Sequence, residues 1–334
     1  MTILIFLFIA LVTGTVEAKT LTACPAGVTK GCDFTGNQAI QAAIDKADDG
    51  DRVQVRAGVY TPEKFVDVPY QQYLIRGAVV LRNKRLTVAG ETGAVIDGTG
   101  APPVSAIVVE GGEITLSNLV LRNLRAGDPE DDLYEGHGVF VIDAAAALHN
   151  LTIEKYAKMA LTGRGSARIV AERLRIQSGH VAIWLEESAH LQLCNSVVRG
   201  NESAGLAIYL NSSANIYNSV FDANHDDGLY ADDEASIFAT NSLLLNNGPY
   251  GVRVVGNSRA VLRHSVLFGN AVKSSSPEGR QQIYWGPGIV ETDPGVNALY
   301  VAAAAREGDP DVRTAALAKS MIGLGDVAAC QAAP

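Results

Sequence analysis

Short runs of alternating apolar and polar residues fill the centre of the chain and predict β-strands rather than helices. In the clearest stretch, such runs cover His190–Cys194, Val197–Arg199 and Gly205–Leu210. A two-residue corner, Asn195-Ser196, separates the first two runs, and a polar turn at 200–204 precedes the third. Alternation places successive side chains on opposite faces of each strand. The stretch therefore predicts one coil of chain that is built from three short strands.

This coil repeats along the chain with a fixed period. Three sets of residues recur every 23 positions, and we call each set a column. The period predicts an architecture of stacked repeats, in which equivalent positions of successive coils lie directly above one another. The columns are Asn201, Asn224, Asn247 and Asn270; Asn195-Ser196, Asn218-Ser219, Asn241-Ser242 and His264-Ser265; and Gly205-Leu206, Gly228-Leu229 and Gly251-Val252.

The fold class that follows is all-β, a right-handed parallel β-helix with three strands per coil and an apolar interior. Successive coils of such a stack lie about 4.8 Å apart. The asparagine columns are expected to fix the coils in register. An asparagine tolerates the left-handed backbone conformation of a corner, and its amide can bond the same amide one coil further on.

The two ends of the coil region differ from its centre. An amphipathic helix is predicted at 37–47, where it would cap the first coil. Residues 61–72 are expected to form a loop, and 283–296 an irregular exit. Residues 298–334 form a predicted C-terminal tail with a weak amphipathic helix at 311–322. The β-helix domain with its capping helix is thus assigned to 37–297.

The first 18 residues have the features of a signal peptide. An apolar run at Ile3–Val12 is too short to span a bilayer. Val16 and Ala18 occupy the −3 and −1 positions of a cleavage site. Residues 19–36 would then form an N-terminal extension of a secreted or periplasmic protein, and no membrane span is expected. The box that ends at Cys24 also resembles a lipidation site, although Glu17 and Lys19 separate it from the apolar run.

Four cysteines are present. In an oxidising compartment Cys24 and Cys32 could close a small loop. Cys194, in a repeat strand, is expected to be a buried thiol. No partner for Cys330 follows from the sequence.

Composition and charge exclude one class of partner. The chain has 334 residues, 47% of them apolar, and a formal net charge of −9, so it is globular and acidic. A nucleic-acid partner would need a basic face. An acidic polysaccharide needs only a local basic or metal-bearing cleft, so it is not excluded.

The coil pattern and the asparagine columns resemble the pectate-lyase-like superfamily of right-handed parallel β-helices. The run GDRVQVRAGVY at 50–60 is similar to the opening of many bacterial members. No subfamily signature is intact. Gly136-His137-Gly138 and Asp226-Asp227 occur in the reverse of the polygalacturonase order, and Asn224-His225-Asp226 lacks the proline of the alginate-epimerase Asp-Pro-His. The resemblance implies the fold and does not choose among lyases, hydrolases, esterases, epimerases, tailspikes and binders.

The resemblance also implies a working face, the outer face of the strands that follow the long turns. Trp184, Tyr209 and Asp232 are expected in one column there, with Tyr230 and Arg253 nearby. Aromatic faces beside a carboxylate suit a sugar ring, although an exposed aromatic stack can also simply protect a sheet. We therefore assign Trp184, Tyr209, Tyr230 and Arg253 to substrate binding.

The most polar coil lies beside these residues and supplies the candidate catalytic groups. Closely spaced carboxylates could bind Ca²⁺, which takes six to eight oxygen ligands, or perform acid–base chemistry. Solvated acidic turns are common in an acidic protein. The catalytic candidates are His180, His225, Asp226, Asp227 and Asp232, and the calcium candidates are Asp227, Asp232 and Asp233.

Two functions remain open from the sequence. The first is a secreted, polysaccharide-directed protein that acts as a lyase or epimerase on uronate-containing polymers. The second is a non-catalytic carbohydrate-binding or structural β-helix protein of the cell surface or periplasm. The polar and aromatic residues on the expected face favour the first, and the lack of an intact catalytic signature favours the second.

Overall fold

The computed structural model describes residues 18–127, 135–270, 283–285 and 289–292. The expected signal peptide, apart from Ala18, lies outside these residues. So do the predicted C-terminal tail, its helix at 311–322 and most of the acidic turn before His137.

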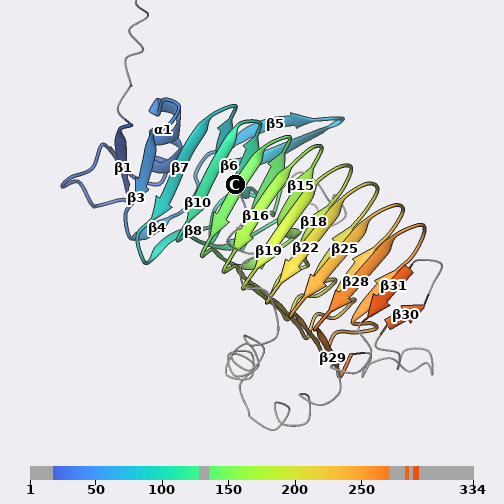
Figure 1. The fold of residues 1–334 in the computed structure, drawn as a ribbon. Helices are drawn as coiled ribbons and strands as arrows, with labels where there is room; N and C mark the ends of the chain where they lie inside the picture. Colours follow the sequence, from blue (N-terminus) through green and yellow to red (C-terminus); the bar gives the residue numbers. More distant parts are fainter. Residues whose placement is uncertain (1–17, 128–134, 271–282, 286–288, 293–334) are drawn as a thin grey trace, which may run out of the picture.

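The described chain winds into a parallel β-helix, as the repeat predicts. Its coils stack from the N-terminal to the C-terminal end, and each regular coil contributes one strand to each of three sheets (Figure 1). All pairings are parallel except that of β5 (Val66–Tyr70) with β6 (Tyr73–Arg82). In the described residues no helix is long and apolar enough to cross a membrane.

Sheet A has 12 strands. Two of them, β1 and β2, come from the expected N-terminal extension and pair at the edge of this sheet. Another, β31, comes from the segment expected to be an irregular exit, and it pairs with β28. The strands are β1 (Thr20–Cys24), β2 (Phe34–Thr35), β3 (Arg52–Val55), β7 (Arg85–Gly90), β10 (Glu113–Ser117), β13 (Ala145–His149), β16 (Arg168–Glu172), β19 (His190–Cys194), β22 (Ser213–Tyr217), β25 (Ser236–Thr240), β28 (Arg259–Arg263) and β31 (Ile289–Thr292).

Sheet B has nine strands and follows sheet A around a two-residue turn in each regular coil. We call this turn the A–B corner; Asn195-Ser196 is one example. The strands are β4 (Gly58–Tyr60), β8 (Ala94–Asp97), β11 (Val120–Leu124), β14 (Thr152–Tyr156), β17 (Arg175–Gln177), β20 (Val197–Arg199), β23 (Val220–Asp222), β26 (Leu243–Leu245) and β29 (Val266–Phe268).

Sheet C has ten strands and carries the expected working face. The segment expected to be a loop at 61–72 contains β5, which forms an antiparallel hairpin with β6, so that prediction is wrong. The strands are β5 (Val66–Tyr70), β6 (Tyr73–Arg82), β9 (Ser105–Glu110), β12 (Val139–Ile142), β15 (Met159–Arg164), β18 (Val181–Leu185), β21 (Leu206–Ile208), β24 (Leu229–Ala231), β27 (Val252–Val254) and β30 (Ile283–Trp285).

The asparagine columns hold the coils in register in two different ways. Asn195, Asn218 and Asn241 stand at the A–B corner with φ near +50°, a left-handed conformation that asparagine tolerates. The second column is buried and forms a ladder of amide–amide bonds. Asn201 donates to Asn224 (2.7 Å), Asn224 to Asn247 (2.9 Å) and Asn247 to Asn270 (3.0 Å).

The N-terminal end of the stack is closed by helix α1 (Ala39–Lys46), within the predicted 37–47. Its apolar face, including Ile40 and Ile44, is buried against the first coils. At its C-terminal end Lys84 Nζ donates to the carbonyls of Ile44 (2.7 Å) and Ala47 (2.8 Å), two of the groups that a helix end leaves unpaired.

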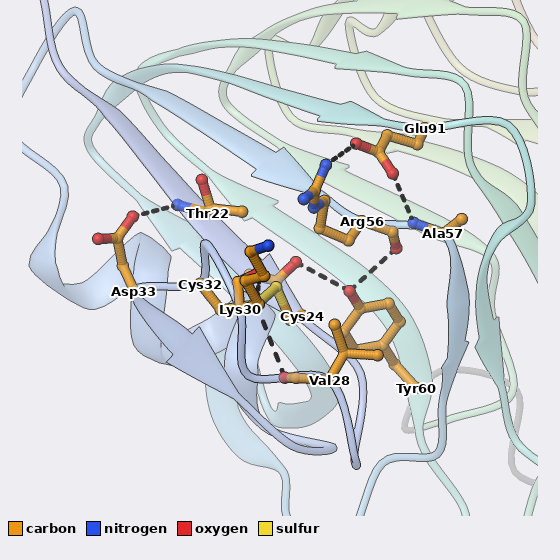
Figure 2. Close-up of a disulfide and its surroundings, with 11 residues drawn as sticks. Thr22, Cys24, Val28, Lys30, Cys32, Asp33, Arg56, Ala57, Tyr60 and Glu91 are labelled. Carbon is orange, nitrogen blue, oxygen red and sulfur yellow. Dashed lines mark hydrogen bonds and ion pairs between the residues drawn. A yellow bond between two sulfur atoms is a disulfide. The ribbon is translucent and has the colours of Figure 1, made fainter.

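A disulfide ties the first strand to the same end. Cys24 bonds to Cys32, and the nearby Tyr60 hydroxyl lies 2.9 Å from the carbonyl oxygen of Ala23 (Figure 2). The proposed pairing of these cysteines is confirmed. Lipid attachment to Cys24 is not supported, because its sulfur is bonded to Cys32 and the residue is part of β1.

The prediction that Cys194 is a thiol is wrong. Cys194 ends β19, is buried and takes part in a disulfide. The described part of the chain contains no free cysteine. The hydrophobic pattern indicated the burial of this residue but carried no information on its pairing.

Candidate functional site

Four neighbouring strands of sheet C place the candidate binding residues on one outer surface. Trp184 in β18, Ala207 in β21, Tyr230 in β24 and Arg253 in β27 occupy equivalent positions. Their neighbours in each strand, such as Leu206 and Leu229, point into the apolar interior. The alternation of each strand therefore directs the aromatic and basic side chains outward.

Tyr209 lies two positions along the coil from this set. It follows β21, and its column contains Asp232 rather than Trp184, since Tyr209 N bonds Leu185 O and Asp232 N bonds Ile208 O. The prediction of a single Trp184–Tyr209–Asp232 column is correct for the last two residues and wrong for Trp184. Trp184 stands 25 positions before Tyr209, not 23, so it lies two positions earlier in its coil.

The three rings nevertheless form one surface, which we call the aromatic platform. Trp184 stacks on Tyr209 with ring centroids 4.5 Å apart and planes 29° apart. Tyr209 and Tyr230 follow at 5.6 Å. Ala207, between Trp184 and Tyr230, is small and buried beneath the rings, which leaves room for the ring of Tyr209.

Two carboxylates accept hydrogen bonds from polar groups of the platform rings. Trp184 Nε1 donates to Glu186 Oε2 (3.0 Å), and the Tyr230 hydroxyl donates to Asp232 Oδ2 (2.8 Å). Burial, together with the negative charges of Asp232 and Glu186, raises the pKa of Tyr209 to about 12. The rings are thus fixed in orientation, and their hydroxyls stay protonated at neutral pH.

A cleft of about 300 Å³ opens at the Trp184 end of the platform, and we call it the hairpin cleft. Its far wall is the β5–β6 hairpin. Glu187 links the two sides, since it accepts hydrogen bonds from the Tyr70 hydroxyl and from Gln71 Nε2. The lining residues are Tyr70, Gln71, Gln72, Tyr73, Met159, Arg164, Trp184, Glu186 and Glu187.

Arg164 supplies a positive charge at the floor of this cleft. Its side chain is largely buried, and its guanidinium forms an ion pair with Glu186, the carboxylate that also holds Trp184. Glu187 in turn accepts a hydrogen bond from the backbone N of Gly165 (2.6 Å). The hairpin cleft thus joins an aromatic wall to fixed polar groups, the usual composition of a small-molecule or sugar site.

Asp227 and Arg253 meet at the opposite end of the platform. Arg253 Nη1 lies 3.8 Å from Asp227 Oδ2, and the guanidinium lies 5.4 Å from the centre of the Tyr230 ring. Asp227 is 1% exposed, and its Oδ1 has no hydrogen-bond partner. Burial, assisted by the charge of Asp226 and opposed by that of Arg253, raises the pKa of Asp227 to about 8.

The three aspartates assigned to calcium do not converge on one point. Asp227 is buried, whereas Asp233 is exposed and accepts from Leu210 N. The carboxylate of Asp232 accepts from Tyr230 and from Asp233 N. Across the described ranges, no group of three His, Cys, Asp or Glu side chains is arranged to hold a metal ion. Calcium binding here stays a prediction that requires these side chains to rearrange.

The two histidines assigned to catalysis lie apart from the platform. His180 and His225 are exposed in the turns before β18 and β24. They occupy one column two coils apart, because Glu202 N bonds Gly179 O and His225 N bonds Asn201 O. Asp226 follows His225 in the same turn and is half-buried. The structure thus brings together the ring and carboxylate candidates, and it leaves the imidazoles at the rim.

Sequence reasoning missed most of the hairpin cleft. The pair Glu186-Glu187 directly follows an apolar strand, and this was a visible signal. Tyr70 and Gln71 gave no such signal, because they reach the site through a hairpin outside the repeat.

The sequence and fold of the chain can be compared with those of known proteins. A family model described as a right handed beta helix region matches residues 105–272. Among solved structures, a pectate lyase is similar with a TM-score of 0.56 and 14% identity, covering 90% of this chain and 88% of that one. No curated protein sequence matches the chain.

Two further structures extend this comparison. The ORF18 protein of Geobacillus virus E2 is similar with a TM-score of 0.50 and 12% identity, covering 82% of this chain and 61% of its own. An alginate lyase from a Paenibacillus species has a TM-score of 0.41 and 11% identity over 82% of this chain and 99% of its own. At 14% and 12% identity, the pectate lyase and the virus protein are similar to this chain in fold alone.

Proposed function

The chain belongs to the family of right-handed β-helix proteins, and we propose that it is a secreted or periplasmic member that binds a polysaccharide along the outer face of sheet C. The observation that carries this proposal is the aromatic platform, with Trp184 and Tyr209 stacked at 4.5 Å beside the hairpin cleft. Flat rings accept the apolar face of a sugar, and the carboxylates around them accept hydrogen bonds from its hydroxyls. A fold shared with a pectate lyase is in keeping with this proposal.

A uronate lyase or epimerase is the second candidate function. It is favoured by Asp227, whose pKa of about 8 suits proton transfer near neutral pH. Arg253 beside it supplies a positive charge for a uronate carboxylate. Asp227 is buried, so catalysis on this route requires the Arg253 side chain to move aside when a ligand binds.

Binding to a panel of polysaccharides tests the first proposal. Pectate, alginate, glycosaminoglycans and neutral glucans would be titrated against the wild-type protein and the Trp184→Ala and Tyr209→Ala variants. Each variant is expected to weaken binding tenfold or more. Tyr217→Ala is the matched control, because Tyr217 pairs with Phe238 on the outer face of sheet A. A platform variant that binds as the wild type does would reject this location.

Product analysis on the same panel separates the two functions. A lyase releases unsaturated uronates that absorb in the ultraviolet, and an epimerase changes the uronate composition of the polymer without shortening it. Both assays would be run with and without Ca²⁺. Binding without any product supports the non-catalytic function, and a product that disappears in Asp227→Asn supports the second candidate.

Export is a separate part of the proposal. It is supported by the features of the first 18 residues and by the Cys24–Cys32 disulfide, since disulfides persist in oxidising compartments. Sequencing of the mature N-terminus should find Lys19 as the first residue. A mature protein that retains Met1 would reject the signal peptide.

A further inference from the structure

The same pairing of an aromatic ring with a carboxylate occurs twice on the outer face of sheet C. Trp184 Nε1 donates to Glu186 Oε2, and two coils further on the Tyr230 hydroxyl donates to Asp232 Oδ2. Backbone pairing puts the two rings in one column and the two carboxylates in another, two positions later in the coil. A ring that donates a hydrogen bond to a charged group is polarised by it, which makes its face more attractive to a cation.

The second of these pairs already has a cation on its ring. The guanidinium of Arg253 lies 5.4 Å from the centre of the Tyr230 ring, within the range of a cation–π contact. It comes from β27, the strand next to that of Tyr230. A ring of the platform, held by its carboxylate, thus accommodates a positive charge on its face.

The first pair has no such cation and lies beside the hairpin cleft. Trp184 and Glu186 both line this cleft of about 300 Å³, a volume at the lower end of those found for small-molecule sites. Among the residues that the structure describes, no Lys or Arg side chain lies over the ring of Trp184 or of Tyr209. This end of the platform can therefore receive a cation from a ligand.

The groups around the first pair carry an excess of negative charge. Glu186 and Glu187 line the cleft, and the only cation in the described part of its lining is Arg164. The side chain of Arg164 is 8% exposed, and its guanidinium is bound to Glu186. Both hydrogen bonds that Glu186 accepts, from Arg164 and from Trp184, go to Oε2, so its Oε1 can accept one from a ligand.

This combination discriminates between sugars by their charge. An ammonium group is attracted by the ring face and by the carboxylates together. A uronate carboxylate would be repelled by Glu186 and Glu187, and the buried Arg164 is already paired. A neutral sugar can stack on Trp184 but gains nothing from the charges.

We propose that the Trp184 end of the platform, together with the hairpin cleft, binds the ammonium group of a polysaccharide that contains free amino sugars. The ammonium lies against the ring of Trp184 and donates to Glu186 Oε1, and Glu187 adds negative charge in the same cleft. This inference rests on the proposed function, because it names the class of polysaccharide that the platform binds.

Three oligosaccharides of equal length test the preference for charge. Hexamers of glucosamine, of N-acetylglucosamine and of galacturonate would be titrated by calorimetry at pH 5.5, where the amines of the first are protonated. The glucosamine hexamer is expected to bind about tenfold more tightly than its acetylated form. The difference should shrink at high ionic strength, because salt screens the charges. Trp184→Ala should weaken the binding of both.

Charge-removing variants test the carboxylates. Glu186→Gln keeps an oxygen for Trp184 and Arg164, and it should reduce the tenfold preference to about threefold or less while the acetylated hexamer binds as before. Glu187→Gln, which leaves the Arg164–Glu186 pair intact, should also reduce the preference. The matched control is Glu172→Gln on sheet A, since Glu172 is 29% exposed and ion-paired, and Glu186 is 28% exposed. The control should keep the preference.

The outcomes separate this inference from the proposed function. If the acetylated or the galacturonate hexamer binds at least as tightly as the glucosamine hexamer, and Trp184→Ala weakens that binding, the inference is overturned and the proposed function stands. A preference that both Glu186→Gln and Glu187→Gln retain also overturns the inference. A hexamer of lysine that binds equally tightly through Trp184 would overturn it too, because the site would then recognise peptide ammonium groups. If none of the saccharides in these titrations or in the panel binds, the proposed function fails as well.

Discussion

Tyr156 donates its hydroxyl hydrogen to Asn201 Oδ1 at 2.5 Å, and this bond ends the asparagine ladder on its N-terminal side. The ring of Tyr156 takes the place that one more ladder residue would occupy. Gly179 makes room for it, because a Cβ at position 179 would lie 2.4 Å from the ring. The backbone N of Gly179 also donates to Asn201 Oδ1, at 3.3 Å.

Tyr156→Phe should destabilise the protein by about 1–2 kcal/mol, because it leaves a buried amide oxygen with one weaker donor. The free energy of unfolding would be measured by urea titration at pH 7. Tyr217→Phe, on the outer face of sheet A, should change it by less than about 0.5 kcal/mol. Equal losses in the two variants would show that the hydroxyl of Tyr156 does not matter.

The two asparagine columns should respond differently to glycine. Asn218 is at a corner with φ +49°, which glycine adopts freely, so Asn218→Gly should cost less than about 0.5 kcal/mol. Asn224→Gly removes the acceptor of Asn201 and the donor to Asn247, and it should cost about 2–4 kcal/mol. Urea unfolding of both variants compares them directly. Similar costs would contradict the separation of roles.

The regular coils could be predicted from sequence because every stacked coil needs the same types of residue at the same positions. Asparagines such as Asn218 stand where the chain adopts the left-handed conformation, and asparagines such as Asn224 continue the amide ladder. Both therefore recur with a period of 23 residues. Gly205 repeats for a similar reason. A Cβ there would lie 2.7 Å from the carbonyl oxygen of Gly228 in the next coil.

The site could be predicted only in part, because its essential contacts are not periodic. The stacking of Trp184 on Tyr209 depends on the small Ala207 between Trp184 and Tyr230, which no repeat requires. The contact of Tyr70 with Glu187 joins residues 117 positions apart through a hairpin that occurs once. A contact that occurs only once in the chain has no repeat in the sequence from which the two partners could be predicted.

Glu187→Ala should loosen the wall of the hairpin cleft. The Tyr70 hydroxyl, Gln71 Nε2 and Gly165 N would all lose their acceptor. Polysaccharide affinity should fall about three- to tenfold, which corresponds to the loss of about one net hydrogen bond. Isothermal titration with the polymer identified in the panel measures it. Glu110→Ala, which breaks the exposed pair with Arg82 on sheet C, is the control and should leave affinity unchanged. The same loss in both variants would argue against a role for the hairpin.

Asp227 should make the protein less stable as the pH rises. Its pKa is about 8 in the folded protein and 3.8 in the unfolded chain. Between these values the folded state keeps a proton that the unfolded state has released, so the unfolded state binds fewer protons and stability falls with increasing pH. The slope from this group is at most about 1.4 kcal/mol per pH unit, and it vanishes above pH 8 and below pH 4.

Asp227→Asn removes this titration while keeping the shape of the side chain. The variant should lose the part of the pH dependence that lies between pH 5 and 8, and at pH 9 it should be more stable than the wild type by a few kcal/mol. Urea unfolding at pH 5, 7 and 9 measures both proteins. Asp233→Asn is the control, since Asp233 is exposed and has a left-handed conformation that asparagine accepts. If Asp227→Asn keeps the wild-type pH profile, then the carboxyl of Asp227 is ionised throughout this range, and its role is to hold Arg253 rather than to transfer a proton.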